Sequence, residues 1–366
     1  MSDTQPALAA RVMRSDYMHF AKAHSHARYN LATSGVADCR LSDLEVSADD
    51  LALHGQNSYG FAPLTEQVAA RFRIDPAFVV MAGGGCSFAN YLAAASLVAP
   101  GDEVLIEDPT YGLLSSMLGF LQAKLILVPR RLEVDWALEP EAFVEKITAQ
   151  TRLIVLTNLH NPSSALADPA AISAIAAAAA KVGAYLMIDE IYLELLFRDE
   201  VAQTAFVPEG PIIVTSGLTK AYGLSGLRCG WILAPKAIAE RMRQLNNLFS
   251  VLPAHISETL ALRAFQRLPE LRRRANALID ENRAAYHAIL GGHPRLHQSL
   301  FGFGTTVFPK LLDGDVEALF EILTREAETS FVPGRFFNRP NHFRIGLAGD
   351  VAMTRTGLER LATALG

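Results

Sequence analysis

Residues 212–234 read IIVTSGLTKAYGLSGLRCGWILA and contain the most informative pattern of the sequence. Two short apolar runs, Ile212–Thr215 and Gly230–Ala234, have the length and the β-branched content of buried strands. The loop between them is built from small residues and carries Lys220 and Arg228. Glycine allows close backbone approach and positive φ, so this loop can wrap a small, rigid group.

The two charged residues of the loop have complementary chemistry. A lysine between apolar strands is partly desolvated, which lowers its pKa and makes Lys220 a candidate Schiff-base nucleophile. The planar guanidinium of Arg228 suits a phosphate because it binds two oxygens at once. An amine and a phosphate-binding group in one loop suggest pyridoxal phosphate (PLP). An ordinary glycine-rich turn with a solvated lysine is the alternative for this loop alone.

The loop also resembles the lysine signature of class I/II, fold-type I PLP-dependent aminotransferases. In that signature a hydroxyl residue precedes the lysine and GLR follows, as in Thr219-Lys220 and Gly226-Leu227-Arg228. The family often has Ser or Thr three residues before the lysine, where this chain has Gly217, and Ser216 is the candidate for the missing phosphate hydroxyl. The resemblance implies that Lys220 is catalytic and that the loop binds the cofactor through Ser216, Thr219 and Arg228.

Composition limits the classes of protein to which the chain can belong. Its 366 residues are enough for two domains, and half of them are hydrophobic, which supports a large core. The formal net charge is −5, and the sequence has no run rich in Lys and Arg. These features give no electrostatic footprint for nucleic acid, so we expect no nucleic-acid partner.

The cysteines and the apolar segments indicate a compartment. Cys39, Cys86 and Cys229 are odd in number and lack CxxC spacing, which suits reduced thiols better than disulfides or a zinc site. The N-terminus lacks the apolar core and cleavage site of a signal peptide. The most apolar window, 170–188, is interrupted by Lys181 and is not typical of a membrane span. We expect a cytoplasmic protein with no membrane contact and no metal.

Strand-like and helix-like segments alternate from about residue 75 to residue 235. The remaining strand-like runs are Val79–Met81, Val104–Glu107, Leu125–Val128, Leu153–Thr157 and Ala184–Ile188. This alternation predicts an α/β fold, a mostly parallel sheet sandwiched by helices. Ligands of open α/β sheets bind at the carboxyl ends of the strands. The candidate binding residues that follow such strands are Gly85, Tyr111, Asn161, Asp189 and Lys220.

A glycine cluster follows the strand at 79–81. The residues Gly83-Gly84-Gly85-Cys86-Ser87 lead into a helix, and free N–H groups at a helix N-terminus bind anions. Neither GK[ST] nor GxGxxG is present, which weakens the readings as a P-loop or a dinucleotide site. The smaller phosphate of PLP fits this cradle, and the resemblance places its phosphate-binding backbone at Gly85, Cys86 and Ser87.

Two more strands end in residues that can contact a flat ring. An aromatic side chain after a strand can stack on a heteroaromatic ring, and residues 100–112 resemble the family's PGDeV…P.Y run, which implies this role for Tyr111. A core tyrosine is the alternative.

Asn161 can donate a hydrogen bond to the cofactor's phenolate oxygen. Where the family has NPTG, residues 161–164 of this chain are NPSS, so the conformation of the local turn can differ from that of the family. The Asn161–Pro162 bond is a candidate cis peptide.

The strand at 184–188 ends in Asp189-Glu190-Ile191-Tyr192. A buried carboxylate beside a ring nitrogen keeps that nitrogen protonated, and the protonated ring is the electron sink that PLP chemistry requires. Side chains alternate along a strand, so we assign Asp189 to the ring nitrogen and leave Glu190 structural. Tyr192 is expected to share the phenolate oxygen with Asn161. The Asp–Glu pair could instead hold Mg²⁺, but no phosphate-transfer motif accompanies it.

Three roles are implied by the resemblance alone. A family tyrosine reaches across a dimer interface to the cofactor phosphate, which implies a homodimer in which Tyr59 serves the neighbouring subunit. Gly35 matches a turn whose backbone N–H meets the substrate carboxylate. Arg344 matches the strand arginine that binds the substrate α-carboxylate. A buried tyrosine, a plain turn and a salt-bridged edge arginine are the respective alternatives.

The alternation of strand-like and helix-like segments ends at Pro235. A long helical tract, 236–290, is punctuated by Pro253 and Pro269. It precedes a mixed segment, 296–350, in which we expect strands at Gly302–Phe308 and His342–Ala348 and a helix at Val316–Glu328. We therefore predict a PLP-binding large domain at 42–240. Residues 241–366, with the N-terminal arm 1–41, are predicted to form a smaller α/β domain.

The residues and the resemblance together predict a PLP-dependent aminotransferase. It would move an amino group between an amino acid and a 2-keto acid through a Schiff base on Lys220. A PLP-dependent lyase, cyclase or decarboxylase is the alternative, because these enzymes differ in which substrate bond stands perpendicular to the ring. A PLP-binding regulator is disfavoured. The substrate side chain is not readable, since Tyr17, Met18 and Phe20 suggest only an apolar-lined pocket.

Overall fold

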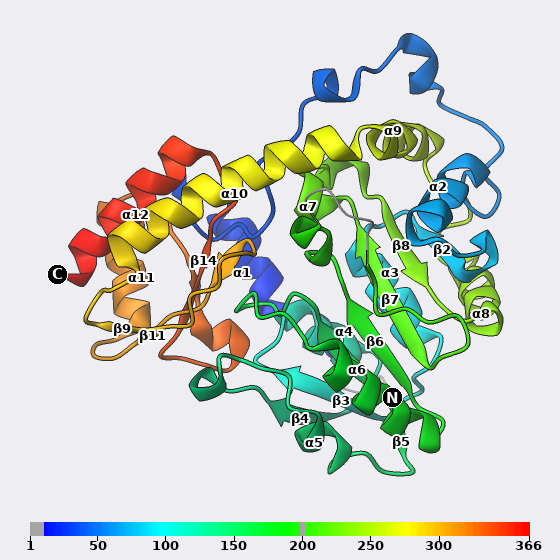
Figure 1. Ribbon diagram of the computed structural model, residues 1–366, viewed down its shortest axis with the longest axis horizontal. Helices are drawn as coiled ribbons and strands as arrows, with labels where there is room; N and C mark the ends of the chain where they lie inside the picture. Colours follow the sequence, from blue (N-terminus) through cyan, green and yellow to red (C-terminus); the bar gives the residue numbers. More distant parts are fainter. Residues whose placement is uncertain (1–10, 198–202) are drawn as a thin grey trace, which may run out of the picture.

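A seven-stranded sheet forms the centre of the protein (Figure 1). The computed structural model describes residues 11–197 and 203–366. In spatial order the strands are β2 (Val79–Ala82), β8 (Gly230–Leu233), β7 (Ile212–Gly217), β6 (Tyr185–Asp189), β5 (Thr151–Thr157), β3 (Glu103–Asp108) and β4 (Lys124–Pro129). β8 is antiparallel to both of its neighbours, whereas the strand pairs from β7 to β4 are parallel. The predicted α/β fold with a mostly parallel sheet is confirmed.

The strands are apolar because both faces of the sheet are covered. Every residue of β3, β7 and β8 is buried. Alternate residues of β3 enter different cores, Leu105 on one face and Val104 and Ile106 on the other. Continuous buried runs of this kind are typical of parallel sheets between helices.

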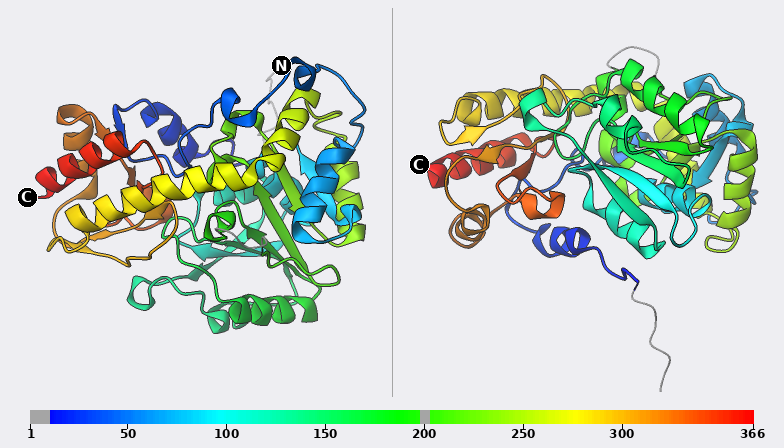
Figure 2. Two further views of the ribbon diagram at one scale, coloured as in Figure 1. Left: turned by 45° about the horizontal axis from the view of Figure 1, so that its top comes forward. Right: turned by 90° about the horizontal axis from the view of Figure 1, so that it is seen from below.

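Helices cover both faces of the sheet (Figures 1 and 2). One core is shared with α3 (Cys86–Ala95), α4 (Gly112–Phe120) and α8 (Lys236–Asn246). The core on the other face is shared with α2 (Ala62–Phe72), α5 (Pro140–Val144), α6 (Pro169–Lys181), α7 (Thr219–Tyr222) and α9 (His255–Gln266). The first half of α10 (Leu268–Leu290) joins this second core through Leu271, Ala275 and Ile279.

The far end of α10, the long yellow helix of Figure 1, belongs to a second lobe with its own core. This lobe contains a sheet of β10 (Thr306–Val307), β14 (Phe343–Gly346) and β13 (Val332–Pro333), a pair of β9 (Leu296–His297) and β11 (Lys310–Leu311), and the helices α11 (Val316–Glu326) and α12 (Val351–Leu365). The N-terminal arm joins it, because β1 (Tyr29–Asn30) pairs with β12 (Thr329–Ser330). The domain boundaries proposed from the sequence stay a prediction.

Two expected elements differ from the observed ones. The helical tract 236–290 is three helices, α8 to α10, with Pro253 between the first two and Pro269 in the first turn of α10. Proline lacks a backbone donor and favours helix starts. The strand expected at 302–308 is reduced to β10. Gly304 has a φ of +84°, which a regular strand does not use.

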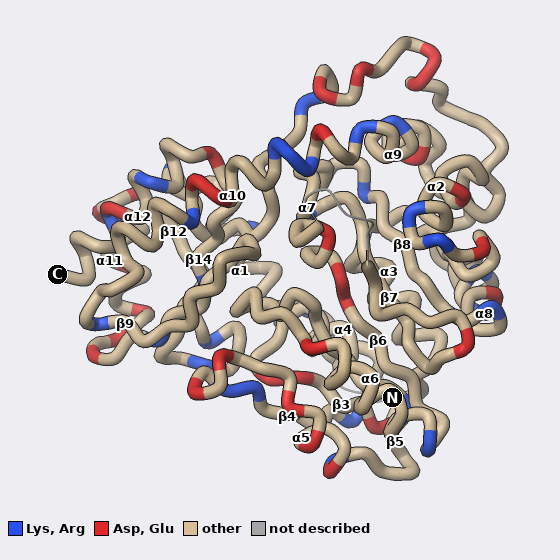
Figure 3. Tube along the Cα trace, in the orientation of Figure 1, with Lys and Arg blue, Asp and Glu red and all other residues tan. Residues whose placement is uncertain are grey.

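Lys and Arg positions are interspersed with Asp and Glu positions along the helices and loops of the chain trace (Figure 3). Within residues 11–197 and 203–366, no helix combines the length and the apolar character needed to cross a bilayer.

Candidate active site

A cavity of about 190 Å³ lies where the predicted strand ends meet. Nine of the predicted site residues line it: Cys86, Ser87, Tyr111, Asn161, Asp189, Tyr192, Thr219, Lys220 and Arg228. Its other lining residues are Met18, Asn90, Thr157 and Ile191. The cavity sits at the carboxyl edge of β5, β6 and β7, the position at which open α/β sheets bind ligands.

Five predicted site residues lie outside this lining, and the fifth, Arg344, is described below. Gly85 is the N-cap of α3, directly before Cys86. Gly35 packs on the lysine stem, since a Cβ there would lie 3.2 Å from Lys220 Cδ. The hydroxyl of Ser216 donates to the backbone oxygen of Glu190 at 3.4 Å. Tyr59 is 57% exposed and does not reach the cavity of its own chain.

Lys220 lies in α7, the short helix that follows β7. Burial, and next the positive charge of Arg344, lower the pKa of its amine to about 8, while Asp189 acts in the opposite direction. Its Nζ donates to the hydroxyl oxygen of Ser34 at 3.2 Å. A lysine with a lowered pKa in a cavity is suited to nucleophilic and acid–base chemistry near neutral pH.

Gly217, the departure from the family signature, has a structural cause. β7 and β8 approach each other closely at this residue, which pairs with Gly230. A Cβ on Gly217 would lie 2.6 Å from the carbonyl oxygen of Cys229. The strand pair therefore leaves no space for a Ser or Thr side chain at this position.

Asp189 ends β6 and is buried. It accepts hydrogen bonds from Asn90 Nδ2 at 2.7 Å, Ile191 N at 3.0 Å and Cys86 Sγ at 3.4 Å. Burial raises the pKa of its carboxyl, and these donors act against that rise. Glu190 is bound elsewhere, since it accepts from the backbone N of Ala205 at 2.8 Å. The two carboxylates therefore lie in different surroundings: Asp189 lines the cavity and Glu190 does not.

An anion cradle lies at the N-terminus of α3. Gly85 has a φ of +76° and directly precedes α3, whose first amides, those of Cys86 and Ser87, have no intrahelical partner. Arg228 Nη2 donates to the carbonyl of Gly84 at 2.6 Å, which holds the guanidinium beside these amides. A Cβ on Gly85 would lie 2.8 Å from the same Nη2, so this approach requires glycine.

Arg344 lies on β14 and is 1% exposed. Its Nη1 donates to Asn161 Oδ1 at 2.9 Å, and its Nη2 donates to Tyr17 OH and to the carbonyl of Ala32, both at 2.9 Å. Its buried Nε has no acceptor among the described residues. An unpaired N–H on a buried guanidinium is costly, and a carboxylate beside it would remove that cost.

The Asn161 turn is held by a buried network. Glu107 binds Arg130 Nη1 at 2.8 Å and accepts from the hydroxyl of Thr157 at 2.6 Å. The same Thr157 oxygen accepts from the backbone N of Asn161 at 2.9 Å. The expected cis bond at Asn161–Pro162 is wrong, because the cis peptides of the described chain are Asp108–Pro109 and Asn158–Leu159.

Tyr111 is the N-cap of α4 and contacts the N-terminal arm. Its hydroxyl donates to Met18 Sδ at 3.4 Å, and its ring meets that of Tyr17 edge to face at 5.1 Å between centroids. Burial raises the pKa of its hydroxyl well above the ordinary value. The side chain is thus a fixed, neutral wall of the cavity.

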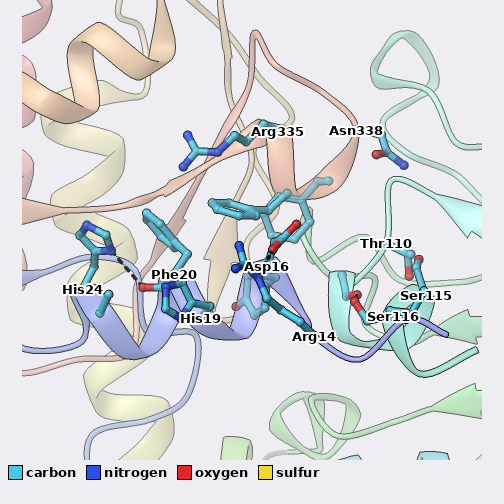
Figure 4. Close-up of a pocket in the computed structure, with 16 residues that line it drawn as sticks. Arg14, Asp16, His19, Phe20, His24, Thr110, Ser115, Ser116, Arg335 and Asn338 are labelled. Carbon is cyan, nitrogen blue, oxygen red and sulfur yellow. Dashed lines mark hydrogen bonds and ion pairs between the residues drawn. The ribbon is translucent and has the colours of Figure 1, made fainter. Parts of the chain in front are cut away.

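A larger hollow of about 760 Å³ adjoins the arm, and Figure 4 shows its lining. Both α1 (Asp16–His24) and the 110–112 turn contribute to it as well as to the cavity. Arg14 and Asp16 form an ion pair of 2.6 Å there, and Arg335 pairs with Glu317. Because these charges are paired within the chain, we assign no binding role to the hollow.

The residues around the cavity fit PLP. The cradle of α3 and Arg228 offers donors for a phosphate, and the glycine at position 85 lets the Arg228 guanidinium approach the start of α3. Asp189 offers a carboxylate for a ring nitrogen, and Lys220 offers an amine of lowered pKa for an aldehyde. This donor set matches one small molecule with a phosphate, a basic ring nitrogen and a carbonyl.

Asn90 and Ser34 are the principal site residues that the sequence reading missed. Asn90 is a lone buried amide on an apolar helix, five residues after Gly85, and its Oδ1 accepts from Thr215 Oγ1. Ser34 directly precedes Gly35, and both residues lie against Lys220. A polar residue in an apolar helix and a hydroxyl beside a predicted turn were the available signals.

Comparison with known proteins agrees with this geometry. The capreomycidine synthase of Streptomyces vinaceus is 29% identical over 358 residues, which are 93% of this chain and 90% of the relative. The aspartate/prephenate aminotransferase of Thermus thermophilus is 26% identical over 324 residues, 84% of this chain and 82% of the relative. A crystal structure of a PLP-dependent aminotransferase from Streptococcus suis has the same fold, with a TM-score of 0.88, 24% identity and coverage of 97% of this chain and 98% of that one. Residues 38–365 match the family described as aminotransferase class I and II, and the chain belongs to this family of PLP-dependent enzymes.

Proposed function

We propose that the protein is an aminotransferase that moves an amino group between an amino acid and a 2-keto acid. The observation that carries the proposal is the buried Lys220, whose pKa is lowered to about 8, in one cavity with Asp189 and the α3–Arg228 cradle. Bound PLP supplies an aldehyde for amines and a protonated ring that accepts electrons. The protein groups described below bind, orient and transfer protons.

Lys220 is the acid–base group in this proposal. A pKa of about 8 lets its amine accept and return a proton near neutral pH. Asp189 would hold the cofactor ring nitrogen. Asn161 would hold the phenolate oxygen, and Tyr192 would donate to it while the Lys220 amine is charged. Tyr111 would cover one face of the ring. The phosphate would be bound by Gly85, Cys86, Ser87, Thr219 and Arg228, and by Ser216 once its hydroxyl turns from the Glu190 carbonyl.

Arg344 and Gly35 are the proposed carboxylate-binding residues. The unpaired Nε of Arg344 supports this assignment, because a substrate carboxylate would supply its missing acceptor. Asn161 holds the guanidinium beside the cavity. A carboxylate fixed at this side would orient the substrate carbon toward Lys220.

We also propose a cytoplasmic homodimer. The apolar side chains of Leu248, Phe249, Val251 and Leu252 are each more than half exposed. They lie beside the Tyr59 turn, because Asn57 Nδ2 donates to the carbonyl of Pro253 at 2.8 Å. A second chain on this surface would bury these side chains and bring its own Tyr59 toward the first chain's cradle. All three cysteines are free thiols, which suits a reducing compartment.

A lyase or cyclase acting on an amino acid is the second candidate. The similarity to a capreomycidine synthase, 29% over 93% of the chain, favours it, because that protein is named for a synthase reaction. The same Lys220 and Asp189 would serve either reaction. The two candidates differ in whether the amino group stays on the protein-bound cofactor or leaves with the product.

A substrate panel separates the candidates. The purified protein with PLP is incubated with single amino acids, first without and then with 2-oxoglutarate or pyruvate. Transfer predicts that a new amino acid forms only when a keto acid is present. Release of ammonia or a cyclised product without any keto acid would instead establish the second candidate.

A further inference from the structure

The N-terminal arm crosses the stem of Lys220. The backbone N of Leu31 donates to the carbonyl of Ser330 at 2.8 Å, and the backbone N of Val36 donates to the carbonyl of Lys220 at 3.0 Å. Gly35 packs on the lysine side chain between these anchors. The segment 31–36 is therefore fixed relative to the lysine, and its side chains keep a defined position at the amine.

Ser34 is the residue of this segment that contacts the reacting amine. It is 3% exposed, and its hydroxyl oxygen accepts from Lys220 Nζ at 3.2 Å. The same oxygen lies 2.8 Å from the hydroxyl of Tyr192. Both Lys220 and Tyr192 line the cavity, so Ser34 bridges two groups of the proposed site.

A serine hydroxyl can hydrogen-bond to an amine in either protonation state, because it has one O–H donor and two acceptor lone pairs. When Lys220 is charged, the ammonium donates to Ser34, and the Ser34 hydroxyl donates to Tyr192. When Lys220 is neutral, Tyr192 donates to Ser34, and the Ser34 hydroxyl donates to the lone pair of the amine. Only the hydroxyls rotate, and neither Ser34 nor Tyr192 gains or loses a proton.

We propose that Ser34 is a catalytic residue that holds the Lys220 amine in one place through both of its protonation states. The inference rests on the proposed function, in which Lys220 accepts and returns a proton. Burial raises the pKa of the Tyr192 hydroxyl well above its ordinary value, so this hydroxyl stays protonated and can take part in either arrangement.

The test compares Ser34→Ala with Ser34→Thr, which keeps the hydroxyl, and with Ser330→Ala as a matched control. Ser330 is a buried serine that the arm pairs with at β12, and it does not line the cavity. Two quantities are measured for each full-length variant. One is kcat and KM with the amino acid of the panel that turns over fastest. The other is the pKa of Lys220 in the PLP-free protein, from the pH dependence of its acetylation by acetic anhydride, followed by mass spectrometry.

Ser34→Ala is expected to lower kcat by about 10- to 100-fold with little change in KM. It should also lower the Lys220 pKa by roughly one unit, because both forms of the amine lose a hydrogen bond and the charge-assisted bond of the ammonium is the stronger of the two. Ser34→Thr should recover most of both losses, and Ser330→Ala should change neither quantity. A reduced kcat with an unchanged Lys220 pKa would show a purely structural role and overturn the inference.

The outcome also separates this inference from the proposed function. If the wild-type protein binds PLP and turns over while Ser34→Ala matches it in kcat and in Lys220 pKa, the inference fails and the function stands. If the wild-type protein neither holds PLP nor converts any amino acid, the proposed function fails and the catalytic role of Ser34 fails with it.

Discussion

Lys220 is an amine in a place where burial and the charge of Arg344 both oppose its cation. The folded chain therefore binds this proton more weakly than the unfolded chain, whose lysine has a pKa of 10.5. Between these pKa values the unfolded state holds more protons, so the free energy of unfolding of the PLP-free protein rises with pH. Below about pH 8 the burial of the charged lysine lowers this free energy by its full amount.

Replacement of this lysine tests the direction of the shift. The PLP-free Lys220→Met variant should be more stable than the wild type at neutral pH. The difference in the free energy of unfolding between the two proteins should shrink by on the order of 1–2 kcal/mol between about pH 8 and about pH 9.5. Urea unfolding of both proteins at each pH measures it. A gap that widens with pH, or that does not change, would contradict the lowered pKa.

Asn90 donates to Asp189, the proposed partner of the cofactor ring nitrogen. Asn90→Ala removes a hydrogen bond to a buried carboxylate, so the Kd for PLP should rise roughly tenfold. Equilibrium dialysis measures this constant. Asn282→Ala is the matched control, because Asn282 is equally buried but bonds to Gly349 and does not line the cavity. Equal PLP affinities in the two variants would remove Asn90 from the site.

At the scale of elements, the close pairing of β7 and β8 places the lysine loop. Gly217→Ser would restore the family's usual residue but press a Cβ against the carbonyl of Cys229. We expect the free energy of unfolding to fall by roughly 2 kcal/mol, with no gain in PLP affinity. Gly226→Ser in the same loop meets no atom within 4 Å and should change stability by less than about 0.5 kcal/mol. Urea unfolding measures both changes in stability. A Gly217→Ser protein that is as stable as the wild type and binds PLP more tightly than the wild type would refute the steric explanation.

On the scale of the whole molecule, the apolar segment 248–252 and the Tyr59 turn form one exposed surface. The protein should have twice the mass of one chain in light scattering. The double change Leu248→Glu and Leu252→Glu should yield single chains with weakened PLP binding, because charges oppose burial of that surface. The control pair, Leu312→Glu and Ile322→Glu, alters exposed residues of the second lobe and should leave a dimer. If the wild-type protein is a monomer that binds PLP and converts its amino acid substrate, the proposal that two chains share each active site is contradicted.

Residues that follow strands could be predicted from the sequence, and residues that act across the fold could not. Tyr111, Asn161, Asp189 and Lys220 each follow an apolar run, and a parallel sheet brings such ends together. Asn90 was missed because its partner Asp189 is 99 residues away in the chain. The hydrogen bond between Ser34 and Lys220 spans 186 residues and depends on how the arm joins the second lobe.

Lys220 is the proposed carrier of the cofactor, and borohydride reduction of the PLP-loaded protein can identify the carrier. Reduction fixes PLP to the amine that holds its aldehyde, and peptide mapping by mass spectrometry identifies that residue. We expect one phosphopyridoxyl group per chain, on Lys220. A group on another lysine, or a protein that remains unlabelled in the presence of PLP, would contradict it.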